Sequence, residues 1–196
     1  AKDIGGVVGI NAYTDSIVMN CYNEGIVNVT GTDAWRVGGV VGYSEGTVDN
    51  CYNKGTVCGK GYFLNVSNVG GVVGYNKGTV KNSHNESHII GDEVVGGVVG
   101  CNYLTVENCY NTGDIDASIS GAGGVAGYNN SSSKLTNCYN EGTVTGRRSG
   151  GVVAENYGTV ENCYNTGDVI GNYYDIGGVA GVNGQNGKII DSYNEG

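Results

Sequence analysis

The apolar residues of this chain recur in short blocks at fixed places within a repeated unit. A Gly-Gly-Val triplet begins each of seven units, and the first glycines of successive units lie 33, 32, 26, 27, 27 and 27 residues apart. These glycines are Gly5, Gly38, Gly70, Gly96, Gly123, Gly150 and Gly177. Because the units fill nearly the whole chain, we expect residues 1–196 to form a single repeat domain.

Each unit contains three apolar blocks. The first reads GGVVG, as at residues 38–42, and the second reads TVxNCYN, as at residues 47–53. The third is Gly-x-Val or Gly-x-Ile, as at residues 55–57. Short blocks rich in Val and Thr and bounded by Gly and Asn predict strands, and no segment sustains the 3.6-residue period of a helix. We therefore expect three short strands per unit.

Equivalent positions of the units form columns that separate an inner face from an outer one. One column is aliphatic throughout and contains Val18, Val48, Val80, Val106, Leu135, Val160 and Ile189. A second contains Val27, Val57, Ile89, Ile115, Val144 and Val169. The position after the first column is mostly polar, as expected for a surface. This pattern predicts an all-β fold, a parallel β-solenoid of about seven coils with three strands per coil. We expect a right-handed β-helix, since propeller blades need about 40 residues or more.

Two asparagine columns accompany the aliphatic ones. Val48 and Cys51 are three residues apart and cannot face the same side of a flat strand, so we expect a bend at Asn50. The equivalent corner residues are Asn20, Asn50, Asn82, Asn108, Asn137, Asn162 and Asp191. The second column is Asn23, Asn53, Asn85, Asn111, Asn140, Asn165 and Asn194. Its amides are predicted to hydrogen-bond from coil to coil.

Five of the seven cysteines share one column, and serine takes the same position in two units. The column is Cys21, Cys51, Ser83, Cys109, Cys138, Cys163 and Ser192. Interchange with serine indicates a small inward side chain, and no Cys-x-x-Cys pair is present to suggest structural zinc. We therefore expect free, buried thiols and no metal site.

Composition and charge exclude several function classes. The chain has 38 glycines and no proline, which excludes proline-rich disorder and collagen. It has 10 basic and 19 acidic residues, a net charge of −9. Without a basic footprint we expect no nucleic-acid partner. No apolar run reaches about 18 residues, so we expect no membrane insertion.

The GGVVG block resembles the GLUG motif repeat family. Residues 39–42 match its Gly-Leu-hydrophobic-Gly pattern with Val in place of Leu, and the following YNxGTVxNCYNxGxVxG stretch is similar to what surrounds that motif. Two units depart from the pattern, at Ala154 and at Ser83-His84. The resemblance implies a bacterial cell-surface or extracellular protein in which the repeats act as a spacer or as an adhesive module towards host glycans or glycoproteins. The alternative is an accessory segment of a secreted enzyme such as an immunoglobulin A protease. The family offers no catalytic residue to carry over, so we expect no enzyme and no cofactor.

Three patterns suggest chemistry but have simpler explanations. Residues 121–127 match a dinucleotide fingerprint without the helix that it needs. His84, Glu86 and His88 lie close together, yet not in the helical HExxH order of a zinc protease. Asp114 and Asp168 occupy equivalent positions about 10 Å apart, at the edge of an inverting glycosidase's carboxylate separation. We expect each to be an ordinary member of its column.

Aromatic residues are the stronger binding candidates. An outward column next to the cysteines, Tyr22, Tyr52, His84, Tyr110, Tyr139, Tyr164 and Tyr193, could stack on sugars or within itself. Irregular loops follow the third block of several units. They hold the predicted binding residues Trp35, Tyr62, Phe63, Tyr173 and Tyr174, or else they merely cover the coil.

The first and last units are cut within the pattern. The chain begins with alanine and has no basic-apolar leader, so we expect an excised piece of a longer protein. Terminal coils without polar caps expose strand edges, and we expect them to associate end to end.

Overall fold

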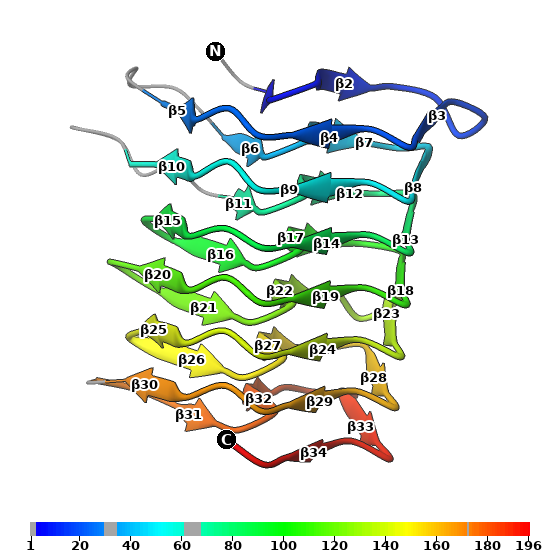
Figure 1. Cartoon of the computed structure of the whole chain (residues 1–196). Coiled ribbons are helices and arrows are strands. Elements are labelled where there is room, and N and C mark those ends of the chain that lie inside the picture. Colours follow the sequence, from blue (N-terminus) through cyan, green and yellow to red (C-terminus); the bar gives the residue numbers. More distant parts are fainter. Residues whose placement is uncertain (1–2, 30–34, 61–67, 172) are drawn as a thin grey trace.

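The structure, a computed structural model, describes residues 3–29, 35–60, 68–171 and 173–196. Within these residues the chain forms 34 short β-strands and no helix. The strands stack in register into five parallel sheets (Figure 1). We number these sheets I to V in the order in which each coil passes through them.

Successive coils each add one strand to a sheet. Sheet I contains β1 (Asp3–Gly5), β6 (Arg36–Gly38), β11 (Asn68–Gly70), β16 (Val94–Gly96), β21 (Gly121–Gly123), β26 (Arg148–Gly150) and β31 (Ile176–Gly177). Sheet II contains β2 (Val8–Asn11), β7 (Val41–Ser44), β12 (Val73–Asn76), β17 (Val99–Asn102), β22 (Ala126–Asn129), β27 (Val153–Asn156) and β32 (Ala180–Asn183). Sheet III contains β3 (Ile17–Met19), β8 (Thr47–Asp49), β13 (Thr79–Lys81), β18 (Thr105–Glu107), β23 (Lys134–Thr136), β28 (Thr159–Glu161) and β33 (Lys188–Ile190). Sheet IV contains β4 (Tyr22–Asn23), β9 (Tyr52–Asn53), β14 (His84–Asn85), β19 (Tyr110–Asn111), β24 (Tyr139–Asn140), β29 (Tyr164–Asn165) and β34 (Tyr193–Asn194). Sheet V contains β5 (Val27–Asn28), β10 (Val57–Gly59), β15 (Ile89–Gly91), β20 (Ile115–Ala117), β25 (Val144–Gly146) and β30 (Val169–Gly171).

This architecture is a parallel β-solenoid, which confirms the predicted fold class. It completes about six turns, slightly fewer than the seven predicted coils, and each full coil has five strands rather than three. The extra strands arise because two predicted blocks contain a bend. The first block divides between sheets I and II after Gly38, and the second divides between sheets III and IV at Asn50. The right-handed sense stays a prediction.

The bend at Asn50 has the predicted cause. All seven corner residues from Asn20 to Asp191 have positive φ, between 47 and 57°. This left-handed conformation is accessible to Asn and Asp at lower cost than to other side chains. The corner turns the chain so that Val48 and Cys51 both point inward, where both are buried.

The interior contains two separate apolar clusters with a polar wall between them. One cluster lies inside sheets II, III and IV around the Val48 column, and the other lies inside sheets I and V around the Val57 column. The wall is the Asn23 column, whose side-chain nitrogens each donate to the side-chain oxygen of the next coil over 2.7–2.8 Å. The predicted amide ladder is therefore confirmed.

The opposite side of this wall is lined by the second glycine of each Gly-Gly pair. A Cβ atom built on Gly97 would lie 2.0 Å from the Gly124 carbonyl oxygen and 2.5 Å from Asn111 Cγ. No side chain fits in that space, so glycine is required where sheet IV passes the bend between sheets I and II.

Candidate functional site

The outward tyrosines of sheet IV stack on one another. From Tyr22 to Tyr193, with His84 as a member, neighbouring ring centres lie 4.6–5.3 Å apart and neighbouring planes differ by 12° or less. Ring faces inside the stack are covered by the adjacent rings. Of the two interpretations of this column, the structure therefore supports mutual stacking, because only ring edges within the stack remain to meet a sugar.

A second aromatic stack lies on sheet II and was not predicted. It consists of Tyr43, Tyr75, Tyr103, Tyr128 and Tyr157, with ring centres 4.9–6.1 Å apart. Cys101 pairs in register with Tyr75 and offers no ring at that position of the stack. The ring of Tyr103, two residues further along the chain, stacks on Tyr75 instead. The recurring Gly-Tyr after the first block was the available signal at three of these five residues.

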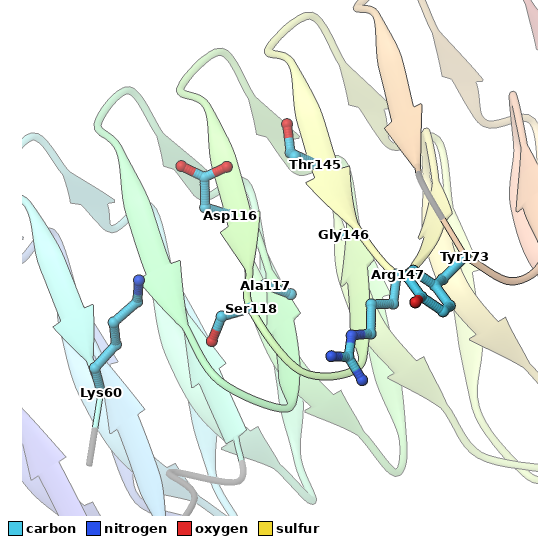
Figure 2. Close-up of a pocket in the computed structure, with 8 residues that line it drawn as sticks. All are labelled: Lys60, Asp116, Ala117, Ser118, Thr145, Gly146, Arg147 and Tyr173. Carbon is cyan, nitrogen blue, oxygen red and sulfur yellow. The ribbon is translucent and has the colours of Figure 1, made fainter. Parts of the chain in front are cut away.

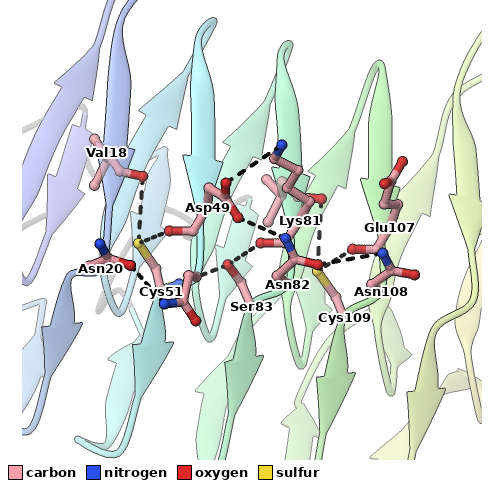
Figure 3. A network of polar contacts seen from close by, with 12 residues as sticks. Val18, Asn20, Asp49, Cys51, Lys81, Asn82, Ser83, Glu107, Asn108 and Cys109 are labelled. Carbon is pink, nitrogen blue, oxygen red and sulfur yellow. Dashed lines mark hydrogen bonds and ion pairs between the residues drawn. The ribbon is translucent and has the colours of Figure 1, made fainter.

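The cysteine column faces inward as predicted. Each thiol or hydroxyl donates to the carbonyl oxygen two residues earlier, at 2.7–3.3 Å. Figure 3 shows this for Cys51, Ser83 and Cys109. Some also accept an N–H from the previous coil: Ser83 Oγ from Cys51 at 3.0 Å and Cys163 Sγ from Cys138 at 3.4 Å. Serine and cysteine can both do this, which explains why they exchange.

Burial makes Cys51, Cys101 and Cys138 poor nucleophiles. Desolvation raises the pKa of Cys51 and Cys138 above the ordinary thiol value and raises that of Cys101 to about 12. A thiol is nucleophilic only as thiolate. All seven cysteines are unpaired in the structure. The geometry thus favours a structural role for the column.

The two histidines do not converge on one site. His84 Nε2 lies 3.1 Å from a Glu86 carboxylate oxygen, whereas His88 Nε2 lies 2.7 Å from Asp116 on the next coil. No group of three or more metal-ligating side chains occurs among the residues that the structure describes.

The acid pair is likewise part of its column. Asp114 and Asp168 lie two coils apart with Thr143 between them, because Ile115, Val144 and Val169 follow one another in register. Asp114 accepts the Thr143 N–H at 3.0 Å, which occupies one carboxylate oxygen within the ladder. Residues 121–127, the apparent dinucleotide fingerprint, form β21 and β22 with a bend between them and no helix.

The binding candidates that the structure describes, Trp35, Tyr173 and Tyr174, lie at the turn that joins sheet V to sheet I. Part of this turn forms a shallow groove of about 420 Å³. The groove is lined by Lys60, Asp116, Ala117, Ser118, Thr145, Gly146, Arg147 and Tyr173 (Figure 2). Its residues come from four coils, so stacking alone brings them together. Polar and charged side chains dominate the lining, with one aromatic ring.

The structure places the predicted binding residues unequally. Tyr173 lines the groove, and the Arg147 guanidinium lies 5.5 Å from its ring centre. Tyr174 lies beside Tyr173 and is exposed. Trp35 is exposed at the same turn of an earlier coil but does not line the groove. Tyr62 and Phe63 lie outside the described residues. Lys60, Ser118 and Arg147 were missed as site residues, although their equivalent places in the repeat could have revealed them.

Comparison with known proteins now identifies the repeat. Three segments of the chain, residues 33–57, 91–116 and 146–170, match the family model of the GLUG motif. These segments are GLUG repeats. The predicted resemblance is confirmed for them. No curated protein and no solved structure matches the chain.

Each GLUG segment covers one complete turn of the solenoid. The second and third segments begin on the last residue of a sheet V strand, Gly91 and Gly146, and all three segments end on a strand of sheet V. Lys60, Ser118 and Tyr173 lie beyond the matched segments, and Arg147 lies at the start of one. The groove is thus built at the joints between GLUG turns, and its side chains are a feature of this chain more than of the motif. No helix in the described part of the chain is long and apolar enough to cross a membrane.

Proposed function

We propose that this chain is a non-catalytic module of an extracellular or cell-surface protein, which holds an adhesive surface for host glycans or glycoproteins on a rigid spacer. The observation that carries the proposal is the groove at the turn between sheets V and I. It gathers side chains from four coils at an edge where the repeat varies in length. Irregular loops on one side of a regular scaffold are where binding residues concentrate.

The remainder of the molecule supports a scaffold role. Its amide ladders, stacked rings and buried thiols are all satisfied by contacts within the solenoid. The acidic pair belongs to such a ladder, and burial raises the pKa of Cys51, Cys101 and Cys138. These features favour a spacer with a binding edge over an enzyme.

The test is binding of the purified chain to an array of host glycans and mucin-type glycoproteins. Tyr173→Ala removes the aromatic ring of the groove, and Tyr13→Ala is the matched control. The two side chains are equally exposed, at 75% and 73%, and Tyr13 lies in the turn between β2 and β3. We expect Tyr173→Ala to weaken binding about tenfold or more, the loss of a ring contact, and Tyr13→Ala to leave it unchanged. Equal effects of both variants would contradict the assignment of binding to the groove, and no binding to any array member would contradict the adhesive function.

A further inference from the structure

We propose that the groove binds an acidic oligosaccharide, one whose carboxylate groups are widely spaced along a hydroxyl-rich chain. This inference rests on the adhesive function above and names its ligand class. It follows from the charges of the groove, their separation and the chemistry between them.

Two cations define the ends of the groove. Lys60 and Arg147 occupy the same position of the repeat, two residues after the outward residues Cys58 and Thr145 of sheet V. Neither forms an ion pair with any residue that the structure describes. The groove therefore has two cations without a described carboxylate partner, in a chain with 19 acidic and 10 basic residues.

The neighbouring arginine shows the contrast. Arg148 pairs with Glu155 and, at 3.2 Å, with Asp175, so its charge is neutralised within the protein. Arg147 instead extends over the ring of Tyr173 beside the groove. A guanidinium held this way keeps its N–H groups available for a carboxylate, which it can bind through two parallel hydrogen bonds.

The separation of the charges limits the ligand. Cys58, Ile90, Asp116 and Thr145 pair in register on successive coils, so Lys60 and Arg147 are three coils apart. At about 4.8 Å per coil the two cations are separated by about 14 Å. Such a distance suits an oligosaccharide with a charge on some of its units. A densely charged polyanion would meet the repulsion of a molecule with net charge −9.

The residues between the cations match the neutral part of such a ligand. Ser118 Oγ donates to Asp92 at 2.8 Å, which leaves its oxygen free to accept from a sugar hydroxyl. Asp116, held by His88, and Thr145 offer further acceptors and a donor along the same line. The Tyr173 ring provides a surface for the apolar face of a sugar ring.

The experiment uses the full chain and three sets of immobilised oligosaccharides with matched backbones: neutral, carboxylated and sulfated. The variants are Lys60→Gln, Arg147→Gln and their combination, with Arg147→Lys to retain charge. Lys77→Gln is the control, because Lys77 is an exposed lysine in the turn between β12 and β13 with no described ion pair. Unchanged circular dichroism and melting temperature establish that each variant is folded.

We expect the carboxylated set to bind more tightly than the neutral set and to be weakened by added salt. Each single Gln substitution should weaken binding about tenfold, the loss of one charge-assisted contact, while Lys77→Gln changes nothing. Arg147→Lys should retain part of the affinity, and sulfated chains that bind equally well would broaden the ligand from carboxylated to anionic saccharides in general.

Two results would overturn the inference without touching the adhesive function. One is equal binding of neutral and carboxylated chains that Tyr173→Ala abolishes, and the other is carboxylate-dependent binding that survives the double Gln variant. Absence of binding to every glycan and glycoprotein would overturn both proposals.

Discussion

At the corner between sheets III and IV, asparagine performs two tasks in the coils from Asn20 to Asn137. The asparagine backbone adopts positive φ, and its side chain bonds to a neighbouring coil, as Asn137 Nδ2 does with Asn108 at 3.2 Å. The sequence predicted this bend correctly because the spacing of Val48 and Cys51 is incompatible with a flat strand. The prediction depended only on Val48 and Cys51, two side chains that both have to point into the interior.

Substitutions at Asn137 should separate the backbone from the side-chain contribution. Asn137→Val places a β-branched residue in the left-handed region, and we expect a loss of about 1–2 kcal/mol in the free energy of unfolding. Asn137→Gly should cost less, because glycine adopts this conformation freely. Thr136→Val, an exchange of equal shape on the preceding strand residue, is the control. Denaturant titration measures all three, and equal losses for Val and Gly would argue against backbone strain.

The hydrogen bonds of the cysteine column predict which substitution at Cys163 lowers the stability of the protein more. Its sulfur accepts the buried Cys138 N–H and donates to the Glu161 carbonyl. Cys163→Ser preserves both bonds, whereas Cys163→Ala leaves that N–H without an acceptor, at a cost of about 1–3 kcal/mol. We expect the Ala variant to melt well below the Ser variant in calorimetry. The opposite order would mean that thiol packing outweighs hydrogen bonding.

At the scale of the element, strand number was the part of the fold that sequence patterns predicted wrongly. Periodicity finds apolar blocks, but a bend inside a block leaves its composition unchanged. The Gly-Gly pair was recognised only as a boundary signal, whereas its second glycine is required by the close passage of Asn111 and its equivalents. That requirement depends on a residue of another sheet, which a local pattern does not contain.

One departure from the repeat is also explained at this scale. Ala154 takes the place of the last glycine of the first block. Its methyl group faces Gly121 on the previous coil, where an added Cβ would lie only 3.1 Å away. Other coils have Asn68 or Val94 at the position of Gly121. The two exceptions therefore compensate each other across neighbouring strands.

Gly97→Ala tests the close approach directly. Its methyl group would overlap the Gly124 carbonyl and the Asn111 side chain, and we expect a loss of about 3 kcal/mol, at the upper end for overpacking. Gly25→Ala is the control, because its nearest heavy atom would be 3.6 Å away. Thermal unfolding followed by circular dichroism compares the two. A Gly97→Ala protein as stable as Gly25→Ala would show that the amide ladder can move.

For the molecule as a whole, the buried thiols imply sensitivity to alkali. A folded-state pKa above the unfolded value stabilises the protein fully below the unfolded pKa, and this stabilisation is lost as pH rises. Unfolded thiols ionise near about 8.5, while burial holds the pKa of Cys101 at about 12. Burial and a hydrogen bond to Glu45 also raise the pKa of Tyr43 to about 12.

We therefore expect the urea midpoint to fall steadily as pH rises from about 8.5 towards 12. Cys101→Val removes one of these groups and should flatten the decline. A midpoint independent of pH over this range would contradict the assignment.

The terminal coils of the 196-residue chain carry strands that pair on one side only. Ile17 and Ile26 on the first coil are exposed. We propose that such chains associate end to end, and expect Ile17→Lys with Ile26→Lys to prevent it by charging the edge. Light scattering over a range of concentrations measures the association. A wild-type chain that remains monomeric at the highest concentration would contradict this proposal.

The candidate site was predictable only in part. Aromatic residues in irregular loops indicated the edge where the groove lies, and Tyr173 lines that groove. Lys60, Ser118 and Arg147 were not, because they come together through register between distant units. A site formed by stacking becomes visible once the units are aligned and the residue that directly follows each sheet V strand is compared between coils.

Because the ladders are in register, the molecule consists of equal steps along the axis of the solenoid. Every coil offers the same amide, ring and backbone partners to the next, so removal of residues 97–123 would leave Gly96 joined to Gly124 and the flanking ladders able to close again. Gain or loss of a unit would change the reach of such a protein by about 4.8 Å, one strand spacing, without redesign of its interior. It would also change how far apart charges at its edge are held, so that length and ligand preference would vary together.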